Sequence, residues 1–187
     1  MPGGKLSLPE SERLVLREWR EKDWPFFAAM NANPQVMRFF PGVMTDKDSL
    51  SMWNRMREEL DERGYGLYAV ELKHSGSLIG LLGFHWADFE ADFTPCVEIG
   101  WRLVPEAWGD GYATEGARAC LKHGFARFGF DRVYSFTACV NFPSQAVMQR
   151  VGMRKIAEFN HPKVAPDSIL YPHVLYVKDT FRKIERE

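Results

Sequence analysis

A glycine-rich stretch, EAWGDGYATEG (Glu106–Gly116), combines residue types and spacing that can bind a phosphate group. It follows the apolar run CVEIGWRLVP and precedes an alanine-rich amphipathic segment, which predicts a strand, a tight turn and a helix. The first N–H groups of such a helix lack partners within the helix and can bind a phosphate. Gly109 and Gly111 would let a ligand approach the backbone closely. A plain strand-to-helix turn is the alternative explanation.

Two familiar phosphate-binding motifs are excluded by the residues of this stretch. A Walker loop ends in Gly-Lys-Ser/Thr, whereas Gly111 is followed by Tyr112 and Ala113. A dinucleotide fingerprint needs a third glycine where this chain has Thr114, and it opens a βαβ unit. The stretch therefore predicts a backbone phosphate cradle that belongs to neither class.

The first half of the chain supplies two helices and four strands. Residues 13–18 predict a strand, and Asp23-Trp24-Pro25 predicts the start of a helix that ends near Asn33. A second helix is expected from about residue 46 or 48 to Arg63, with Gly64 as its stop. Its apolar face is predicted to contain Leu50, Trp53, Met56 and Leu60. Three consecutive strands are expected over residues 64–72, 77–86 and 96–104.

The second half alternates helices and strands after the glycine-rich stretch. A helix, a strand, a short helix and two final strands around a long loop are expected, the last four elements over residues 132–140, 143–151, 153–159 and 173–181. The resulting order is β-α-α-β-β-β-α-β-α-β-β. It predicts an α/β (α+β) domain with a mixed, mostly antiparallel central sheet flanked by helices.

The composition of the chain is that of one globular domain, with 187 residues, 45% apolar and 26% charged. We expect this domain over residues 12–187, after a flexible segment at 1–11. A net charge of −1 argues against nucleic acid or a membrane surface as partner. Cys96, Cys120 and Cys139 show no disulfide or metal-binding spacing, so no metal site and a cytoplasmic location are expected. No signal peptide is recognised, and the run LIGLLGF is too short to span a bilayer.

The run EIGWRLVPEAWGDGYATEG resembles motif A of the GNAT superfamily of acyl-CoA-dependent N-acetyltransferases, in particular the RimJ/RimL-like branch. Further similar segments are ERLVLREW, NPQVMRFFP, VNFPSQAVMQRVGM and HVLYV, which together span nearly the whole chain. The resemblance implies a GNAT-like fold and acetyl-CoA as co-substrate, held in part by Trp108, Gly109, Gly111, Tyr112, Ala113 and Thr114. Glu106 and Asp110 depart from the family pattern, and two carboxylates beside a pyrophosphate are unfavourable unless they turn to solvent.

Acetyl transfer to an amine needs a base for the amine proton, stabilisation of the carbonyl oxygen and an acid for the leaving thiolate. The resemblance implies Glu98 as the base, although a strand glutamate that faces solvent or pairs with an arginine is the alternative. It implies that the backbone at Leu103 and Val104 bulges and binds the acetyl carbonyl and the pantetheine. It also implies that Asn141 and Ser144 contact coenzyme A and that Ser144 is the acid, although both residues also fit a helix cap.

The acceptor side is less defined by the sequence. Phe39, Phe40 and Trp86 are candidates to line an acceptor pocket, with core packing as the alternative. His161 and His173 are candidate acceptor contacts or a second choice of base. The acceptor is expected to be a protein N-terminus or a small-molecule amine, and the protein a monomer or homodimer. A non-catalytic acyl-CoA-binding module is the alternative function, and a ligand-free interaction module is a third.

Overall fold

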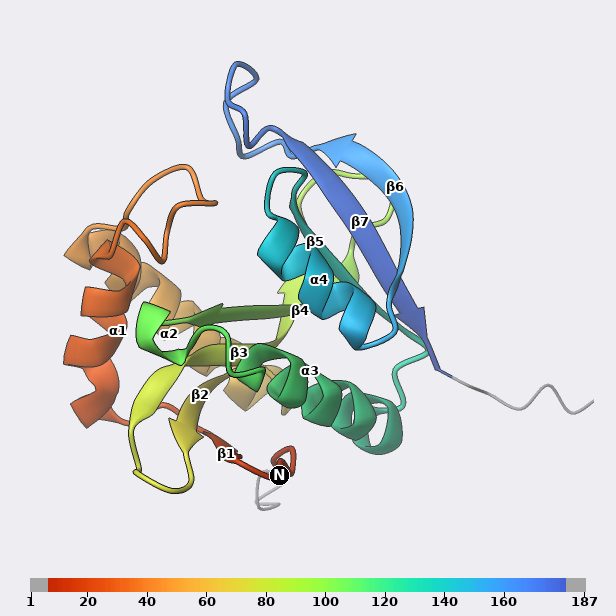
Figure 1. Ribbon diagram of the computed structural model, residues 1–187. Helices are drawn as coiled ribbons and strands as arrows, with labels where there is room; N and C mark the ends of the chain where they lie inside the picture. The colour runs from red at the N-terminus through yellow and green to blue at the C-terminus, as the bar shows by residue number, and fades with distance from the viewer. Residues whose placement is uncertain (1–6, 181–187) are drawn as a thin grey trace, which may run out of the picture.

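The computed structural model describes residues 7–180 (Figure 1). A seven-stranded sheet contains β1 (Leu14–Arg17), β2 (Leu67–Leu72), β3 (Leu78–Ala87), β4 (Cys96–Leu103), β5 (Arg132–Ala138), β6 (Arg154–Asn160) and β7 (Pro172–Asp179). The α-helices are α1 (Trp24–Ala32), α2 (Asp46–Arg63), α3 (Tyr112–His123) and α4 (Phe142–Arg150). Three short helical turns, η1 (Glu21–Asp23), η2 (Pro105–Ala107) and η3 (Gly124–Phe128), complete the described elements.

The strand order β1-β2-β3-β4-β5-β7-β6 divides the sheet into two antiparallel parts that meet at β4 and β5. β3 and β4 pair over eight residue pairs, from Gly80 with Leu103 to Ala87 with Cys96. β4 and β5 run parallel and pair at Glu98 with Tyr134. The two strands therefore separate toward the carboxyl end of β4, and this leaves room for a ligand between the two parts of the sheet.

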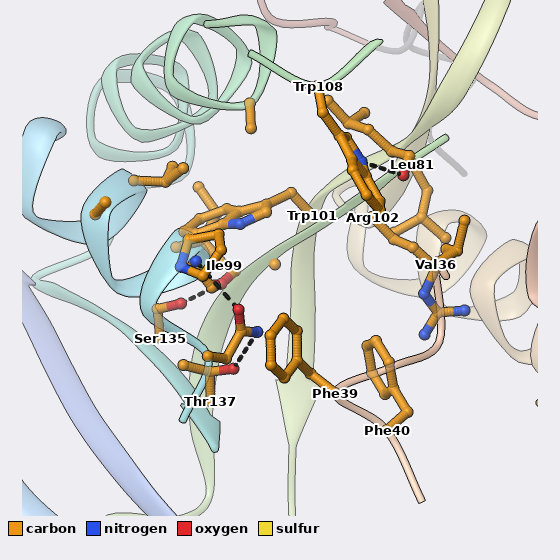
Figure 2. Close-up of a pocket in the computed structure, with 18 of the residues that line it drawn as sticks. Val36, Phe39, Phe40, Leu81, Ile99, Trp101, Arg102, Trp108, Ser135 and Thr137 are labelled. Atoms are coloured by element: carbon orange, nitrogen blue, oxygen red, sulfur yellow. Dashed lines mark hydrogen bonds between the residues drawn. The ribbon is translucent and has the colours of Figure 1, made fainter. Parts of the chain in front are cut away.

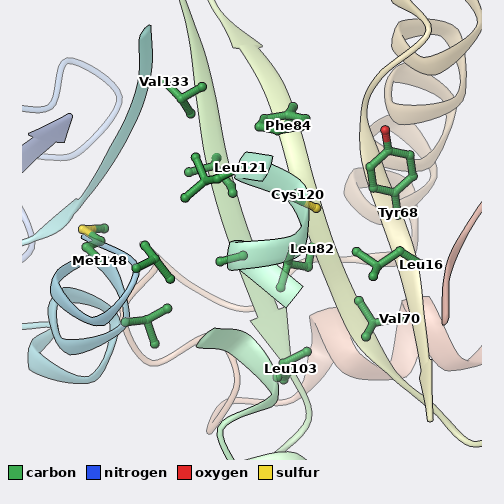
Figure 3. Close-up of a cluster of buried hydrophobic side chains, with 14 of the residues drawn as sticks. Leu16, Tyr68, Val70, Leu82, Phe84, Leu103, Cys120, Leu121, Val133 and Met148 are labelled. Carbon is green, nitrogen blue, oxygen red and sulfur yellow. The ribbon is translucent and has the colours of Figure 1, made fainter. Parts of the chain in front are cut away.

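The helices cover the two faces of the sheet. Residues of α3 and α4, among them Cys120, Leu121 and Met148, pack on one face against Leu82 and Phe84 of β3 (Figure 3). A second apolar cluster is formed largely by α1 and α2 on the other face and includes Phe27, Trp53, Ala69 and Leu81. The sheet thus separates the α3 side from the α1–α2 side, and β4 presents side chains to both.

Helix α2 shows how local sequence sets the element boundaries. Thr45 accepts a hydrogen bond from the Asp48 N–H and so caps the helix, and Gly64 ends it with a φ of 73°. Trp53, Met56 and Leu60 are buried as expected, but the prediction for Leu50 is wrong because its side chain is 49% exposed. Ser49 takes the buried position instead and lies next to Asn31 of α1.

The observed order of strands and α-helices is the one predicted from the sequence. The last strand was expected to reach Phe181, which lies outside the described residues, as do residues 1–6 of the expected flexible segment. Of the rest of that segment, Ser11 donates a hydrogen bond to Glu115 of α3, and the Ser7 carbonyl contacts His123.

Candidate active site

A cavity of about 1360 Å³ lies where β4 and β5 separate. Its wall is built from the segment between α1 and α2, from β4, from the start of α3, from α4 and from the loop between β6 and β7. Typical small-molecule sites occupy roughly 300–1,000 Å³, so this cavity has room for an elongated ligand and a second molecule beside it.

The glycine-rich stretch lies at one end of this cavity. Gly109 and Gly111 adopt φ values of 87° and 80°, a region that residues with a Cβ rarely enter. Gly111 is the N-cap of α3, and no side chain caps the helix. The N–H groups of the first turn, Tyr112 to Thr114, therefore remain free for an anion at the positive end of the helix dipole. This geometry fits the pyrophosphate of coenzyme A.

The acidic residues of the stretch do not face the cavity. Glu106 and Asp110 are exposed and are absent from its lining, which removes the electrostatic conflict that the sequence raised. Three arginines line this end of the cavity instead, namely Arg13, Arg118 and Arg150. Glu12 and Glu115 line the same end, so three cations face two carboxylates, and the remaining positive charge is suited to a phosphate-bearing ligand.

Two of these arginines are held in defined positions. Arg13 pairs with Glu115 at 2.6 Å and lies over the ring of Tyr112 at 4.5 Å, and Arg118 donates to the carbonyl of Arg150. No feature of the sequence indicates this role of Arg13, because it lies about 100 residues from the stretch that it supports. Only the pairing of β1 with the sheet brings it there.

The backbone of β4 provides polar groups at the centre of the cavity. The Val104 N–H donates to the carbonyl of Ile79 at 2.9 Å, and Val104 is absent from the cavity lining. The expectation that Val104 contributes a free N–H is therefore wrong. Neighbouring residues of a strand direct their backbone N–H and C=O groups to opposite sides. The backbone groups of Leu103 and Trp101 therefore face the gap toward β5. The Leu103 carbonyl accepts a hydrogen bond from the Trp108 ring at 2.8 Å (Figure 2). The Leu103 N–H faces the part of the gap where β4 and β5 no longer pair.

Glu98 lies in β4 directly opposite His85 of β3, and both line the cavity. Burial raises the pKa of Glu98 to about 7, with His85 acting to lower it and Glu59 to raise it. A carboxyl with a pKa near neutrality can accept a proton at physiological pH, as a general base must. The sequence alternative, an ion pair between Glu98 and an arginine, is not formed among residues 7–180.

Glu59 of α2 completes a row of three titratable groups with His85 and Glu98. The Nδ1 atom of His85 lies 2.7 Å from Oε2 of Glu59. Burial by itself lowers the pKa of His85, but the hydrogen bond and the negative charge of Glu59 outweigh it and raise the pKa overall. The carboxylate therefore favours the protonated, positively charged ring next to Glu98.

Asn141 and Ser144 line the cavity at the start of α4. The Asn141 side chain accepts from the Ser144 N–H at 3.3 Å and donates to Thr137 of β5 at 2.8 Å (Figure 2). Asn141 is therefore an N-cap, and the same contacts fix the direction of Ser144. Both explanations considered from the sequence, capping and contact with a ligand, are compatible with this geometry.

Two histidines lie on the β6–β7 side of the cavity. The rings of His161 and His173 are 4.8 Å apart and are in contact with Phe159. Burial, with the nearby charge of His173, lowers the pKa of His161 to about 4, and burial also lowers the pKa of His173. Both rings are neutral at pH 7. Glu98, whose pKa is closer to neutrality, is the better placed base.

The aromatic candidates divide into two groups. Phe39 and Phe40 line the cavity on the α1–α2 side, across from Ser135 and Thr137 of β5 (Figure 2). Trp86 does not line the cavity, contrary to the expectation that it lines an acceptor pocket. Side chains alternate along β3, and with His85 facing the cavity, Trp86 points the other way and lies under Arg63 at 4.6 Å.

Other features of the described chain bear on the kind of protein this is. Within residues 7–180, no three His, Cys, Asp or Glu side chains are grouped so as to hold a metal ion. No helix in the same range has the length and apolar character needed to cross a membrane. All three cysteines are free thiols.

The sheet opens between β4 and β5, beside the glycine turn and the start of α3. This arrangement is suited to an elongated, phosphate-bearing ligand that lies between the two halves of the sheet. The acetyltransferase (GNAT) domain matches residues 13–154, and the chain belongs to this family. The family's activity makes it an acetyl-CoA-dependent acetyltransferase, which confirms the predicted class of enzyme and co-substrate.

Individual relatives agree with this membership. The chain is 32% identical over 146 residues to the "Uncharacterized N-acetyltransferase YnaD" of Bacillus subtilis (strain 168), covering 78% of this chain and 81% of YnaD. An acetyltransferase (GNAT family) from Bacillus anthracis has a TM-score of 0.75 and 27% identity, covering 92% of this chain and 98% of the other. Mycobacterium smegmatis RimJ, solved in complex with CoA-disulfide, shares the fold with a TM-score of 0.72 at 20% identity, covering 89% of this chain and 82% of the RimJ chain.

Proposed function

We propose that the protein transfers the acetyl group of acetyl-CoA to a primary amine, by direct attack while both substrates are bound. The observation that carries the proposal is Glu98, a carboxyl with a pKa of about 7 in a cavity large enough for two ligands. The name of the relative YnaD, an N-acetyltransferase, supports an amine as acceptor. Both a protein N-terminus and a small-molecule amine are compatible with an amine acceptor.

Glu98 acts in this proposal as the general base. Its carboxylate takes one proton from the acceptor ammonium, directly or through a water molecule, and the neutral nitrogen then attacks the acetyl carbonyl carbon. The N–H of Leu103 donates to the carbonyl oxygen as negative charge develops there, because it faces the gap between β4 and β5 without a strand partner. Both groups lie on the same strand, which fixes their relative position.

Ser144 and Asn141 act on the other side of the reacting carbon. When the carbon–sulfur bond breaks, the Ser144 hydroxyl gives its proton to the sulfur and so prevents the return of the thiolate. The attacking nitrogen gives up its second proton to Ser144, directly or through water, which restores the hydroxyl and leaves a neutral amide. Asn141 holds Ser144 through the helix cap. The free N–H groups of Tyr112, Ala113 and Thr114 bind the pyrophosphate at the other end of the cavity.

The proposal is tested by release of the coenzyme A thiol from acetyl-CoA in the presence of a panel of amines and peptides. We expect at least one class of amine to raise the release well above the hydrolysis background, with one N-acetylated product per thiol. If acetyl-CoA raises the melting temperature but no amine raises thiol release, the protein is instead a binding module.

A further inference from the structure

Arg102 occupies the acceptor side of the cavity, on the same strand as the proposed base. Glu98 and Arg102 are four residues apart in β4, and alternation along a strand places both side chains on one face. Arg102 pairs in the sheet with Leu81, whose side chain belongs to the apolar cluster of α1 and α2. Arg102 therefore lies on the face of the sheet opposite α3, away from the phosphate cradle.

The guanidinium of Arg102 is partly buried and has no carboxylate partner within residues 7–180. Its Nη1 donates to Oδ1 of Asn31. The guanidinium lies over the ring of Phe40, at 4.4 Å from the ring centroid, and both residues are labelled in Figure 2. The Nε atom is buried and has no hydrogen-bond partner among residues 7–180. The other neighbours of Nη1 are the sulfur atoms of Met44 and Met52 at 3.9 Å, which are weak acceptors.

An enclosed cation without a counter-ion is energetically unfavourable. Burial lowers the pKa of Arg102 to about 10. The buried Arg17, by contrast, pairs with both Asp23 and Glu71. Arg102 is therefore an exception, and an anion that entered the cavity would supply the missing partner.

The surroundings of Arg102 hold its guanidinium in place rather than neutralise it. Asn31 is fully buried in α1 and also lies 3.4 Å from the Ser49 hydroxyl of α2. Phe40 fixes one face of the guanidinium plane. Arg38, from the same segment as Phe40, also lines the cavity and forms no ion pair within the described residues. This side of the cavity thus presents two cations, and Glu98 is the acidic residue of β4 that lines the cavity with them.

We propose that Arg102 is an anion-binding subsite for the acceptor, so that the preferred acceptor is a small amine that also carries a carboxylate. This inference rests on the proposed function, in which the acceptor is an amine, and it adds a carboxylate as the second group of the acceptor that the protein recognises. Glu98 receives the amine, and Arg102 binds the carboxylate. Their α-carbons are roughly 13 Å apart for four residues of strand. The separation favours a carboxylate several bonds from the amine over one on the adjacent carbon.

The test compares pairs of acceptors that differ only in charge, namely 4-aminobutyrate and 6-aminohexanoate against their carboxamides. For each acceptor, kcat/KM is measured by thiol release for the parent, for Arg102→Gln and for Arg102→Lys. The parent should prefer the carboxylates by roughly 10-fold to 100-fold, the range of charge-assisted hydrogen bonds. Arg102→Gln should abolish the preference, because kcat/KM falls for the carboxylates and changes little for the carboxamides. Arg102→Lys should retain part of the preference for the carboxylates.

A matched control removes a positive charge elsewhere. Arg57 is exposed on α2 and pairs with Glu21, outside the cavity, so Arg57→Gln should keep the full preference of the parent. Equal loss for carboxylates and carboxamides in Arg102→Gln would show a purely structural role and overturn the proposal. The proposal would also be overturned if the parent protein showed no preference between the two kinds of acceptor, or preferred the carboxamides.

Calorimetric titration of the same acceptors into the coenzyme A-bound protein separates this proposal from the proposed function. Tighter binding of the carboxylates that depends on Arg102, in a protein that acetylates neither compound, would support the subsite and contradict the proposed transfer. Acetylation without any dependence on Arg102 in either measurement would support the transfer and contradict the subsite. If Arg102→Gln fails to fold, the Arg102→Lys variant decides, because a weaker preference is still expected from it.

Discussion

Replacement of Glu98 by glutamine should stabilise the protein at alkaline pH. The pKa of Glu98 is raised from an ordinary value of 4.5 to about 7, chiefly by burial. The folded state therefore holds this proton more tightly than the unfolded chain, and stability falls as pH rises from about 4.5 to 7. Above that range the ionised carboxylate costs the folded state about 3 kcal/mol. The Glu98→Gln variant carries no such charge.

We expect Glu98→Gln to be more stable than the parent by about 3 kcal/mol at pH 8, and by less than about 1 kcal/mol at pH 5. The measurement is urea unfolding of both proteins at the two pH values, followed by tryptophan fluorescence. Glu62→Gln is the matched control, because Glu62 is exposed on the same helix as Glu59. This control should change stability little at either pH.

Two outcomes would contradict the raised pKa of Glu98: a Glu98→Gln variant with the same stability as the parent at pH 8, or one with an equal gain in stability at both pH values. The first result would mean that the cavity hydrates the carboxylate and leaves its pKa ordinary. The second would mean that the gain comes from packing of the amide rather than from charge. Loss of activity together with gain of stability is the combination expected of a strained catalytic group.

Three further outcomes follow from the site. Because the charge of His85 lowers the pKa of Glu98, His85→Asn should move the pH midpoint of activity upward, and a downward shift would contradict the assignment. Gly111→Ala should lower the free energy of unfolding by about 1–2 kcal/mol, because its backbone is left-handed, and should weaken acetyl-CoA binding in calorimetry. Gly76→Ala places the same strain in a remote turn and should not affect acetyl-CoA binding. Ser144→Ala should lower kcat with acetyl-CoA affinity retained, and an unchanged kcat would remove Ser144 from the mechanism.

The elements and the cofactor end of the site could be predicted because local sequence controls them. Thr45 and Gly64 set the ends of α2, and the glycines at 109 and 111 are required by the positive φ values of the turn. The error at Leu50 arose because a spacing of three or of four residues before Trp53 fits an apolar face equally well, and the buried position falls on Ser49. Trp86 lies outside the cavity because side chains alternate along β3 and His85 faces the cavity.

The remaining parts of the site depend on contacts between distant segments. Glu59 and His85 come together only when α2 packs against β3, and no periodicity in either segment indicates that contact. Arg102 could have been found, since its four-residue spacing from Glu98 places both on one face of a strand. Its lack of a carboxylate partner becomes visible only once α1 and the segment around Phe40 are in place.

The central claim is that Glu98 accepts the proton of the acceptor amine. Its most direct test is the rate of acetyl transfer as a function of pH, for the parent and for Glu98→Gln, with acetyl-CoA and amine both saturating. If Glu98 is the base, the rate should rise with pH through a midpoint near 7 in the parent, and should be much lower without that midpoint in the variant. The same midpoint in both proteins would show that another group is the base.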